Sequence, residues 1–264
     1  MHAKLLVQAS FNRAATRYDA AAVVQKEVCA ELMAGLNRYA IAKPAQILDA
    51  GCGTGFGSSL LQLHWPESEL TLVDFAPAML QHAQHSGQKP CVADMEALPF
   101  ANASFNLWWS SLAIQWCNNQ QVFYEAHRVL RPGGLLAVST VGADTFKELR
   151  QAFSAVDNYQ HTLSFTSQDK LYNDLQQQSF KNIEIQRKTF TQYYSNLKNL
   201  LNAVKAVGAN QVTSGGRSSL MGRTSWKNLE TAFEELRTPH GLPLSYDVLM
   251  AYATTSTYKR ETKA

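Results

Sequence analysis

Apolar and polar residues alternate along the first half of the chain as short buried strands followed by amphipathic helices. Residues 20–40 predict the first helix, because Val24, Val28, Leu32 and Leu36 recur every four residues. Strands and helices then take turns over about 100 residues, which is typical of a parallel sheet with helices on both faces. The predicted strands are 45–51, 69–76, 90–94, one within 104–116, and 135–141, and the predicted helices are 55–65, 77–87 and 118–134, the last closed by a glycine pair.

The pattern changes after residue 142. Two further helices are predicted over 143–157 and 167–180, and residues 182–194 alternate like a half-exposed strand. Residues 242–258 predict a last strand that pairs with 183–193. Residues 195–240 are helical in pattern apart from TSGGRSS, so they would form an insertion between two antiparallel edge strands.

Composition narrows the class of protein. Apolar residues make up 45% and charged residues 17% of the 264 positions, which fits a soluble globular protein. No apolar run approaches the roughly 18 residues of a membrane span, and the first residues lack the apolar centre of a signal peptide, so we expect a cytoplasmic protein without membrane contact. The four cysteines are widely spaced and form no CxxC pair, so we expect free thiols and no metal site.

Positive charge is concentrated in one segment. The whole chain carries a net charge of +3, but residues 181–227 contain eight lysines and arginines against Glu184 alone, a local balance of +7. Such a segment indicates an acidic partner or an anionic substrate, with a merely solvated basic face as the alternative.

The stretch LDAGCGTGFG, residues 48–57, is the first that indicates a ligand-binding site. A strand, a glycine-rich turn and a helix cradle an anionic or polar ligand, because the glycines allow close approach and the helix start offers free N–H groups. No Lys-Ser or Lys-Thr pair follows, which disfavours a nucleoside triphosphate site. Asp74 can accept from two ribose hydroxyls or cap a helix, and Asp94 can accept from an exocyclic amine or close a turn. We expect residues 49–53, Asp74, Asp94 and residues 110–116, which follow strand ends, to converge on one crevice.

Together with ADMEALPF and RVLRPGG, these residues resemble class I S-adenosylmethionine (SAM)-dependent methyltransferases over residues 45–142. The resemblance implies a Rossmann-like, seven-stranded α/β sheet with helices on both faces and an inserted helical cap. It also implies SAM as cofactor and S-adenosylhomocysteine as product. The glycine loop would hold the amino acid part of SAM, Asp74 the ribose, and Asp94 the adenine, with Met95 stacking on its edge. The implied cofactor-binding residues are Asp49, Gly51, Gly53, Gly55, Asp74, Phe75, Asp94, Met95 and Ser110.

A narrower resemblance covers nearly the whole chain. FNRAATRYD, SLAIQWC, KAVGAN and LPLSYDVL are similar to the malonyl-acyl-carrier-protein O-methyltransferase family of biotin synthesis (BioC). It implies an N-terminal helical segment over the cofactor (1–40), a methyltransferase core (41–194 and 241–264) and a basic helical lid (195–240). It implies methyl transfer to the carboxylate of a malonyl thioester on an acidic carrier protein or on coenzyme A, with the carrier docking on the basic segment and no nucleic acid involved.

A carboxylate is ionised near neutral pH, so this chemistry requires positioning rather than a general base. Tyr18 and Gln115 are the catalytic candidates, and the substrate-binding candidates are Tyr18, Trp116, Lys205, Arg217 and Arg223. One rival is a C- or O-methyltransferase for a free small molecule such as a quinone precursor, which would leave the basic segment without a role. The other rivals are a nucleic-acid methyltransferase or binding module, disfavoured because SSLAIQW replaces an Asn-Pro-Pro-Tyr type motif, and a SAM-binding protein without catalysis.

Overall fold

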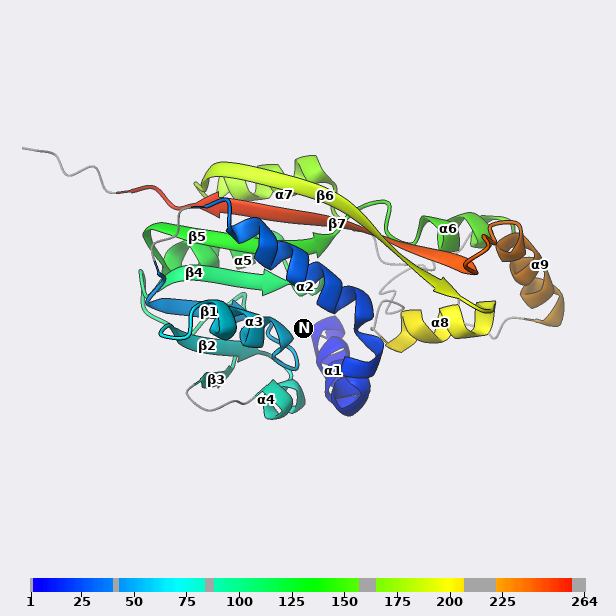
Figure 1. The fold of residues 1–264 in the computed structure, drawn as a ribbon, viewed down its shortest axis with the longest axis horizontal. Helices are drawn as coiled ribbons and strands as arrows, with labels where there is room; N and C mark the ends of the chain where they lie inside the picture. The colour runs from blue at the N-terminus through cyan, green and yellow to red at the C-terminus, as the bar shows by residue number, and fades with distance from the viewer. Residues whose placement is uncertain (1, 40–42, 84–87, 157–164, 207–221, 258–264) are drawn as a thin grey trace, which may run out of the picture.

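A mixed sheet forms the centre of the molecule in the computed structural model, which describes residues 2–39, 43–83, 88–156, 165–206 and 222–257 (Figure 1). Across these residues seven strands lie in the order β3-β2-β1-β4-β5-β7-β6. β7 runs antiparallel to both of its neighbours, and the other pairs are parallel. The strands are β1 (Gln46–Ala50), β2 (Glu69–Asp74), β3 (Lys89–Val92), β4 (Phe105–Ser111), β5 (Leu130–Val141), β6 (Lys181–Tyr194) and β7 (Leu242–Thr254).

Helices cover both faces of this sheet. α2 and α3 pack on one face through Leu32 and Leu61, and α5 and α7 pack on the other through Phe123 and Leu171. The helices are α1 (His2–Ala21), α2 (Val23–Leu36), α3 (Phe56–His64), α4 (Pro77–Ala83), α5 (Asn119–Val129), α6 (Lys147–Ser154), α7 (Gln168–Gln177), α8 (Leu197–Ala206) and α9 (Arg223–Glu234), with a 3₁₀ turn η1 (Ile114–Trp116). In the described residues no helix is long and apolar enough to cross a membrane.

Alternation along the central strands divides the core into two sides. Ile47, Leu107 and Trp109 face α2 and α3, whereas Leu48 and Trp108 face the opposite helices. Since both faces are covered, these strands are apolar almost without interruption, as parallel strands usually are. The prediction of a seven-stranded α/β sheet with helices on both faces is confirmed.

Two details of the prediction are wrong. The helix predicted over 118–134 ends at Val129, and Gly133 and Gly134 lie within β5, because Leu130 already pairs with Phe105 of β4. The last strand is also not an edge strand. β7 lies between β5 and β6, so of the two strands β6 alone is at an edge, and β3 is at the other edge of the described sheet.

The first 39 residues contain two helices where one was expected. α1 and α2 are separated at Ala22, whose backbone (φ −85°, ψ +40°) leaves the helical region. α2 lies on the sheet, while α1 packs on α4 and extends beside the carboxyl ends of β1 and β2 (Figure 1). The expected end of the α4 helix at Gly87 falls outside the described residues.

The segment between β6 and β7 forms a separate end of the molecule. β6 and β7 are longer than the other strands and project beyond them as a two-stranded ribbon, with α6, α8 and α9 around its tip (Figure 1). Leu200 of α8 and Phe233 of α9 are fully buried there, so the apolar faces of both helices are covered.

Candidate active site

A cleft opens at the carboxyl ends of β1, β2 and β4 and encloses about 970 Å³, including space open to solvent at its mouth. This main cleft brings together Asp49, Gly51, Asp74, Asp94 and Trp116, which come from four separate stretches of the chain. They meet because the carboxyl ends of parallel strands lie at one edge of a sheet. The convergence expected from the sequence is therefore present.

The glycine loop is shaped by the atoms that stand against its backbone. Gly51 has a φ of +74°, and a Cβ there would lie 2.5 Å from the Cβ of Ala113 and 2.8 Å from the Cε of Met95. Gly53 differs: no described heavy atom comes within 4 Å of its Cβ position, so its backbone faces the open cleft. Gly55 lines neither cavity and instead packs on α4. Gly51 thus keeps the cleft open, and Gly53 offers its backbone to a ligand.

Asp74 connects the glycine loop to the end of β2. Its Oδ2 accepts from the Gly53 N–H at 2.9 Å, and its Oδ1 accepts from the Ala76 N–H at 2.8 Å. Burial raises the pKa of this carboxyl to about 6, although the backbone N–H groups oppose the shift. A carboxylate so placed can hold the loop and still accept from a ligand, since each oxygen has two lone pairs.

The inner end of the cleft contains buried polar atoms around Gly57. A Cβ at position 57 would lie 3.0 Å from Trp109 Nε1, 3.3 Å from Cys29 Sγ and 3.5 Å from Asp49 Oδ2. Asp49 Oδ2 accepts from Ser58 Oγ at 2.6 Å, and burial raises the pKa of Asp49 to about 7. The indole N–H of Trp109 is fully buried and has no partner in the described structure. An unpaired donor beside a carboxylate fits the zwitterionic amino acid end of SAM.

The carboxylate of Asp94 lies at the other end of the cleft. Asp94 Oδ1 accepts from the Glu96 N–H at 3.0 Å, while its Oδ2 contacts Lys4 Nζ at 2.5 Å. Lys4 also lies 2.7 Å from Glu96 Oε1. Asp94 retains acceptor capacity toward the cleft, as an adenine amine requires, and Met95 lines the wall beside it.

Helix α1 forms the outer wall of the cleft. Tyr18 and Phe11 line it, and the Phe11 ring packs edge-on against Phe75 at 6.3 Å and against Trp116 at 5.8 Å. The helix is fixed at both ends of this contact, by Gln8 Nε2 donating to the Phe75 carbonyl at 2.5 Å and by the Thr54 hydroxyl donating to the Asp19 carboxylate at 2.6 Å. α1 therefore closes the cleft over the glycine loop and β2.

A second cavity, of about 460 Å³ including space open to solvent, adjoins the main cleft. We call it the side chamber. Tyr18, Phe11 and Trp116 line both cavities, so they form the boundary between them. Gln115 lines the side chamber only, and its Nε2 donates to the Leu112 carbonyl at 2.6 Å. Its far wall comes from the segment after β5, from Phe165 and from Tyr246 of β7.

Comparison with known proteins identifies the family. Residues 48–138 match the model of a methyltransferase domain. The chain is 45% identical to a malonyl-[acyl-carrier protein] O-methyltransferase from Dechloromonas aromatica over 95% of this chain and 94% of that one, and 40% identical to the protein of that name from Laribacter hongkongensis over 95% and 89%. The chain belongs to the malonyl-[acyl-carrier protein] O-methyltransferase family.

A crystal structure of the YcgJ protein from Bacillus subtilis shows the same fold at 14% identity, with a TM-score of 0.61 over 87% of this chain and 99% of that one. SAM is the cofactor, and the main cleft has the donor and acceptor groups that it requires. The predicted resemblance to this O-methyltransferase family is thus confirmed over almost the entire chain.

Not every residue expected from the O-methyltransferase motifs lines a cavity. Ser110 is buried behind the main cleft, and Ser111 lines it instead, because successive strand residues point to opposite faces. Lys205 and Arg223 are exposed on α8 and α9 and line neither cavity. Arg217 lies outside the described residues.

Three residues that line or flank the cavities are not among the site residues predicted from the sequence. Lys4 is one of several cations near the N-terminus, and only the packing of α1 brings it to Asp94. Trp109 lies in an apolar strand, and Tyr246 lies in the motif LPLSYDVL, but both have the apolar neighbours of core residues. Only the positions of the two cavities show that the polar atoms of these side chains belong to the site.

Proposed function

We propose that the protein transfers a methyl group from SAM to the free carboxylate of malonyl-acyl carrier protein, giving the malonyl methyl ester that primes pimeloyl synthesis for biotin. The observation that carries this proposal is the similarity over 95% of the chain to relatives named for that reaction. The four cysteines are unpaired, which suits a reducing compartment, and we place the reaction in the cytoplasm.

The side chamber suits an acceptor that needs no general base. Carboxyl groups with ordinary pKa values near 4 are ionised at neutral pH. Among the described residues of the chamber lining there is no histidine, aspartate or glutamate. When bound, SAM supplies an electrophilic methyl group on its sulfonium sulfur. The protein's task is then to align a carboxylate oxygen with that methyl group and to exclude water, which the aromatic boundary of Phe11, Tyr18 and Trp116 supports.

Incubation with SAM and malonyl-loaded carrier protein should add one methylene unit of mass to the carrier, as seen by intact-protein mass spectrometry. Acetyl-loaded carrier protein is the control and should not change, because only the malonyl group offers a free carboxylate. No gain, in a preparation that binds SAM by calorimetry, would refute the acceptor. The search would then turn to free small molecules.

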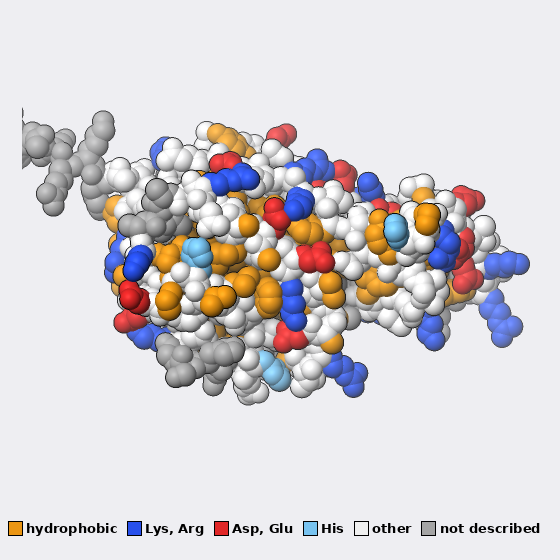
Figure 2. Space-filling model, in the orientation of Figure 1, with side chains coloured by type: hydrophobic (Ala, Val, Ile, Leu, Met, Phe, Trp, Pro, Cys, Tyr) orange, Lys and Arg blue, Asp and Glu red, His pale blue; other side chains and the backbone are white. Residues whose placement is uncertain are grey.

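The basic segment 181–227 supports docking of an acidic carrier. Two of its cations already form ion pairs within the chain. Arg187 pairs with Asp247 at 2.7 Å, and Lys188 pairs with Glu31 at 2.6 Å. The cations of α8 and α9 form no ion pair with the described residues and are exposed (Figure 2); they are Lys198, Lys205, Arg223 and Lys227. Acidic side chains lie among them in Figure 2, so the surface is mixed rather than uniformly positive. Charges at such a surface mainly accelerate encounter with an oppositely charged partner.

Reversing charge at Lys205, Arg217 and Arg223 should raise the KM for malonyl-carrier protein by about tenfold. The KM for malonyl-CoA should change less, since coenzyme A carries only its phosphate charges and lacks the extended acidic surface of a carrier protein. Steady-state kinetics at low and high salt would measure both, and the difference should shrink at high salt. Lys43→Glu, an exposed change before β1 and away from the cleft, is the matched control. Equal effects on the two substrates would remove the docking role.

A further inference from the structure

The side chamber must hold a carboxylate, yet it offers no positive charge. Among its described lining residues there is no lysine or arginine. Its polar groups are the side chains of Tyr18, Gln25, Gln115, Thr145 and Tyr246, together with the indole N–H of Trp116. The question is which of these donors can reach an anion.

Neutral donors agree with the chemistry that we propose above. Attack of a carboxylate on a sulfonium methyl group removes a negative and a positive charge together. A lysine or arginine bound to the carboxylate would stabilise the charged reactants more than the transition state, and so would slow the step. A neutral hydroxyl orients the same oxygen while holding it less strongly.

Two hydroxyls in the chamber are free to donate. The Thr145 hydroxyl is occupied, since it donates to the Asp247 carbonyl at 2.9 Å. None of the hydrogen bonds between described side chains involves the hydroxyl of Tyr18 or of Tyr246, and both side chains line the chamber. Burial raises the pKa of both phenols, so both stay protonated at neutral pH and can act as donors.

Tyr246 is held rigidly by its neighbours in the chain. On one side Ser245 is fixed by Glu148, which accepts from its N–H at 3.1 Å and from its hydroxyl at 2.6 Å. On the other side Asp247 accepts two hydrogen bonds from Arg187, at 2.7 and 3.0 Å. The Tyr246 ring also packs edge-on against Phe146, with ring centroids 4.8 Å apart. The backbone of Tyr246 is therefore held by both neighbours, and its ring is supported by Phe146.

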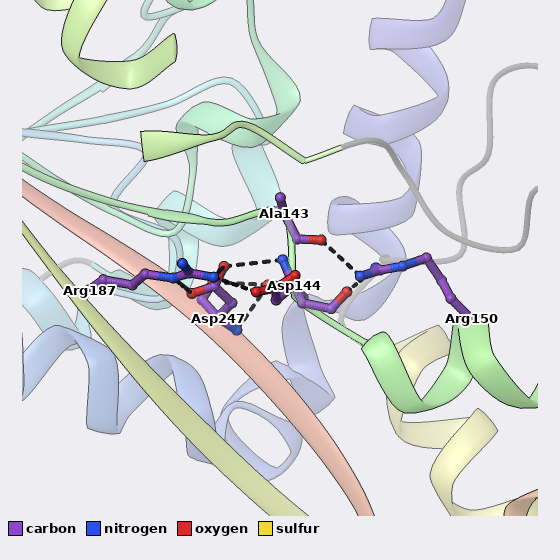
Figure 3. Close-up of polar contacts among 6 residues, drawn as sticks. Ala143, Asp144, Arg150, Arg187 and Asp247 are labelled. Atoms are coloured by element: carbon purple, nitrogen blue, oxygen red, sulfur yellow. Dashed lines mark hydrogen bonds and ion pairs between the residues drawn. The ribbon is translucent and has the colours of Figure 1, made fainter. Parts of the chain in front are cut away.

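The adjoining part of the same wall, the segment after β5, is fixed by the same network (Figure 3). Asp247 Oδ2 accepts from the Asp144 N–H at 3.1 Å, and Arg150 donates to the carbonyls of Ala143 and Thr145. Figure 3 shows Arg150 and Arg187 reaching this segment from opposite sides. Both arginines thus support the chamber from outside it, in place of binding the substrate within it.

We propose that the hydroxyls of Tyr246 and Tyr18 together hold the substrate carboxylate by neutral hydrogen bonds, one on each side of the side chamber. The inference rests on the proposed function and adds Tyr246 as a second residue that positions the acceptor. It also explains why the cations of α8 and α9 lie away from the cavities: their role is toward the carrier.

The test is acyl-CoA binding to the full chain saturated with S-adenosylhomocysteine, measured by calorimetry. Wild-type protein should bind malonyl-CoA more tightly than acetyl-CoA. Tyr246→Phe should reduce that preference, and kcat/KM for malonyl-CoA, by about 10- to 100-fold, because one hydrogen bond to a charged group is lost. Its affinity for S-adenosylhomocysteine should be unchanged, which also shows that the variant folds.

The matched control is Tyr252→Phe. Tyr252 lies on the same strand, and its hydroxyl donates to the Leu32 carbonyl at 2.9 Å outside both cavities. This variant should lose stability but keep the malonyl preference. If Tyr246→Phe kept the wild-type preference for malonyl-CoA over acetyl-CoA, the role of Tyr246 would be overturned, but the proposed function would stand. A wild-type protein that binds both thioesters equally and methylates neither would overturn the proposed function, and this inference with it.

Discussion

Replacing Asp74 with alanine should weaken binding of SAM and of S-adenosylhomocysteine by about 100- to 1,000-fold. Two losses combine in this variant. The ribose hydroxyls lose a charged acceptor, and the Gly53 and Ala76 N–H groups lose the carboxylate that orients the loop. Each hydrogen bond to a charged group is worth about 1.5–3 kcal/mol, so the loss of two such interactions reaches this range. Isothermal calorimetry on the cofactor alone measures the effect without an acceptor substrate.

A control on the same strand separates the site from the fold. Glu69→Ala removes an exposed carboxylate at the other end of β2, where it pairs with Lys89 at 2.6 Å. Surface ion pairs of this kind contribute little, so that variant should bind cofactor as the wild type does. If Asp74→Ala kept wild-type affinity, the assignment of Asp74 to the ribose would have to be abandoned.

Asp49 should make the cofactor-free protein less stable as the pH rises. Burial raises the pKa of this carboxyl to about 7 in the folded protein, against about 4 in the unfolded chain. The folded state therefore retains a proton that the unfolded state releases. The stabilisation is fully present below pH 4, declines as the pH rises, and is lost above pH 7. The total change is on the order of 4 kcal/mol.

Comparison with Asp49→Asn isolates this effect from all other titrations. Asparagine keeps an oxygen that can accept from Ser58 but cannot ionise. Urea unfolding between pH 4 and pH 8 should show a growing advantage of the variant up to about pH 7 and a constant one above it. A gap that stays the same across this range would show that the carboxyl ionises in the folded protein as readily as in the unfolded chain.

The cofactor half of the site could be predicted from the sequence, because its residues directly follow recognisable strands. Gly51 and Asp74 stand at the ends of apolar strands, and parallel strands bring their carboxyl ends together.

The order of the last strands in the sheet could not be predicted in the same way. The antiparallel pairing of residues 183–193 with the last strand was correct, but whether β7 or β6 adjoins β5 depends on which apolar faces can be covered. β7 is buried along nearly its whole length, whereas most residues of β6 are exposed or half-buried. The pattern of apolar and polar residues within each strand does not by itself predict this difference.

The acceptor half could be predicted only in part. Tyr18, Gln115 and Trp116 lie in recognisable motifs, and all three line the side chamber. Tyr246 lies in the motif LPLSYDVL, more than 200 residues after Tyr18, but the motif does not show whether this tyrosine packs in the core or lines a cavity. The reverse holds for Lys205, whose charge suggests a substrate contact although its helix turns it to solvent.

The position of β7 has a consequence for how the protein is made. β5 acquires its second neighbour only from residues 242–254, so its edge stays unpaired while about 100 further residues are synthesised. At roughly 5–20 residues per second, a ribosome needs several seconds to supply the missing strand. β6 is synthesised earlier, but in the folded protein it pairs with β7 and not with β5. During that interval the nascent chain exposes a long apolar strand edge of the kind that pairs with other chains, and early chaperone binding would protect it.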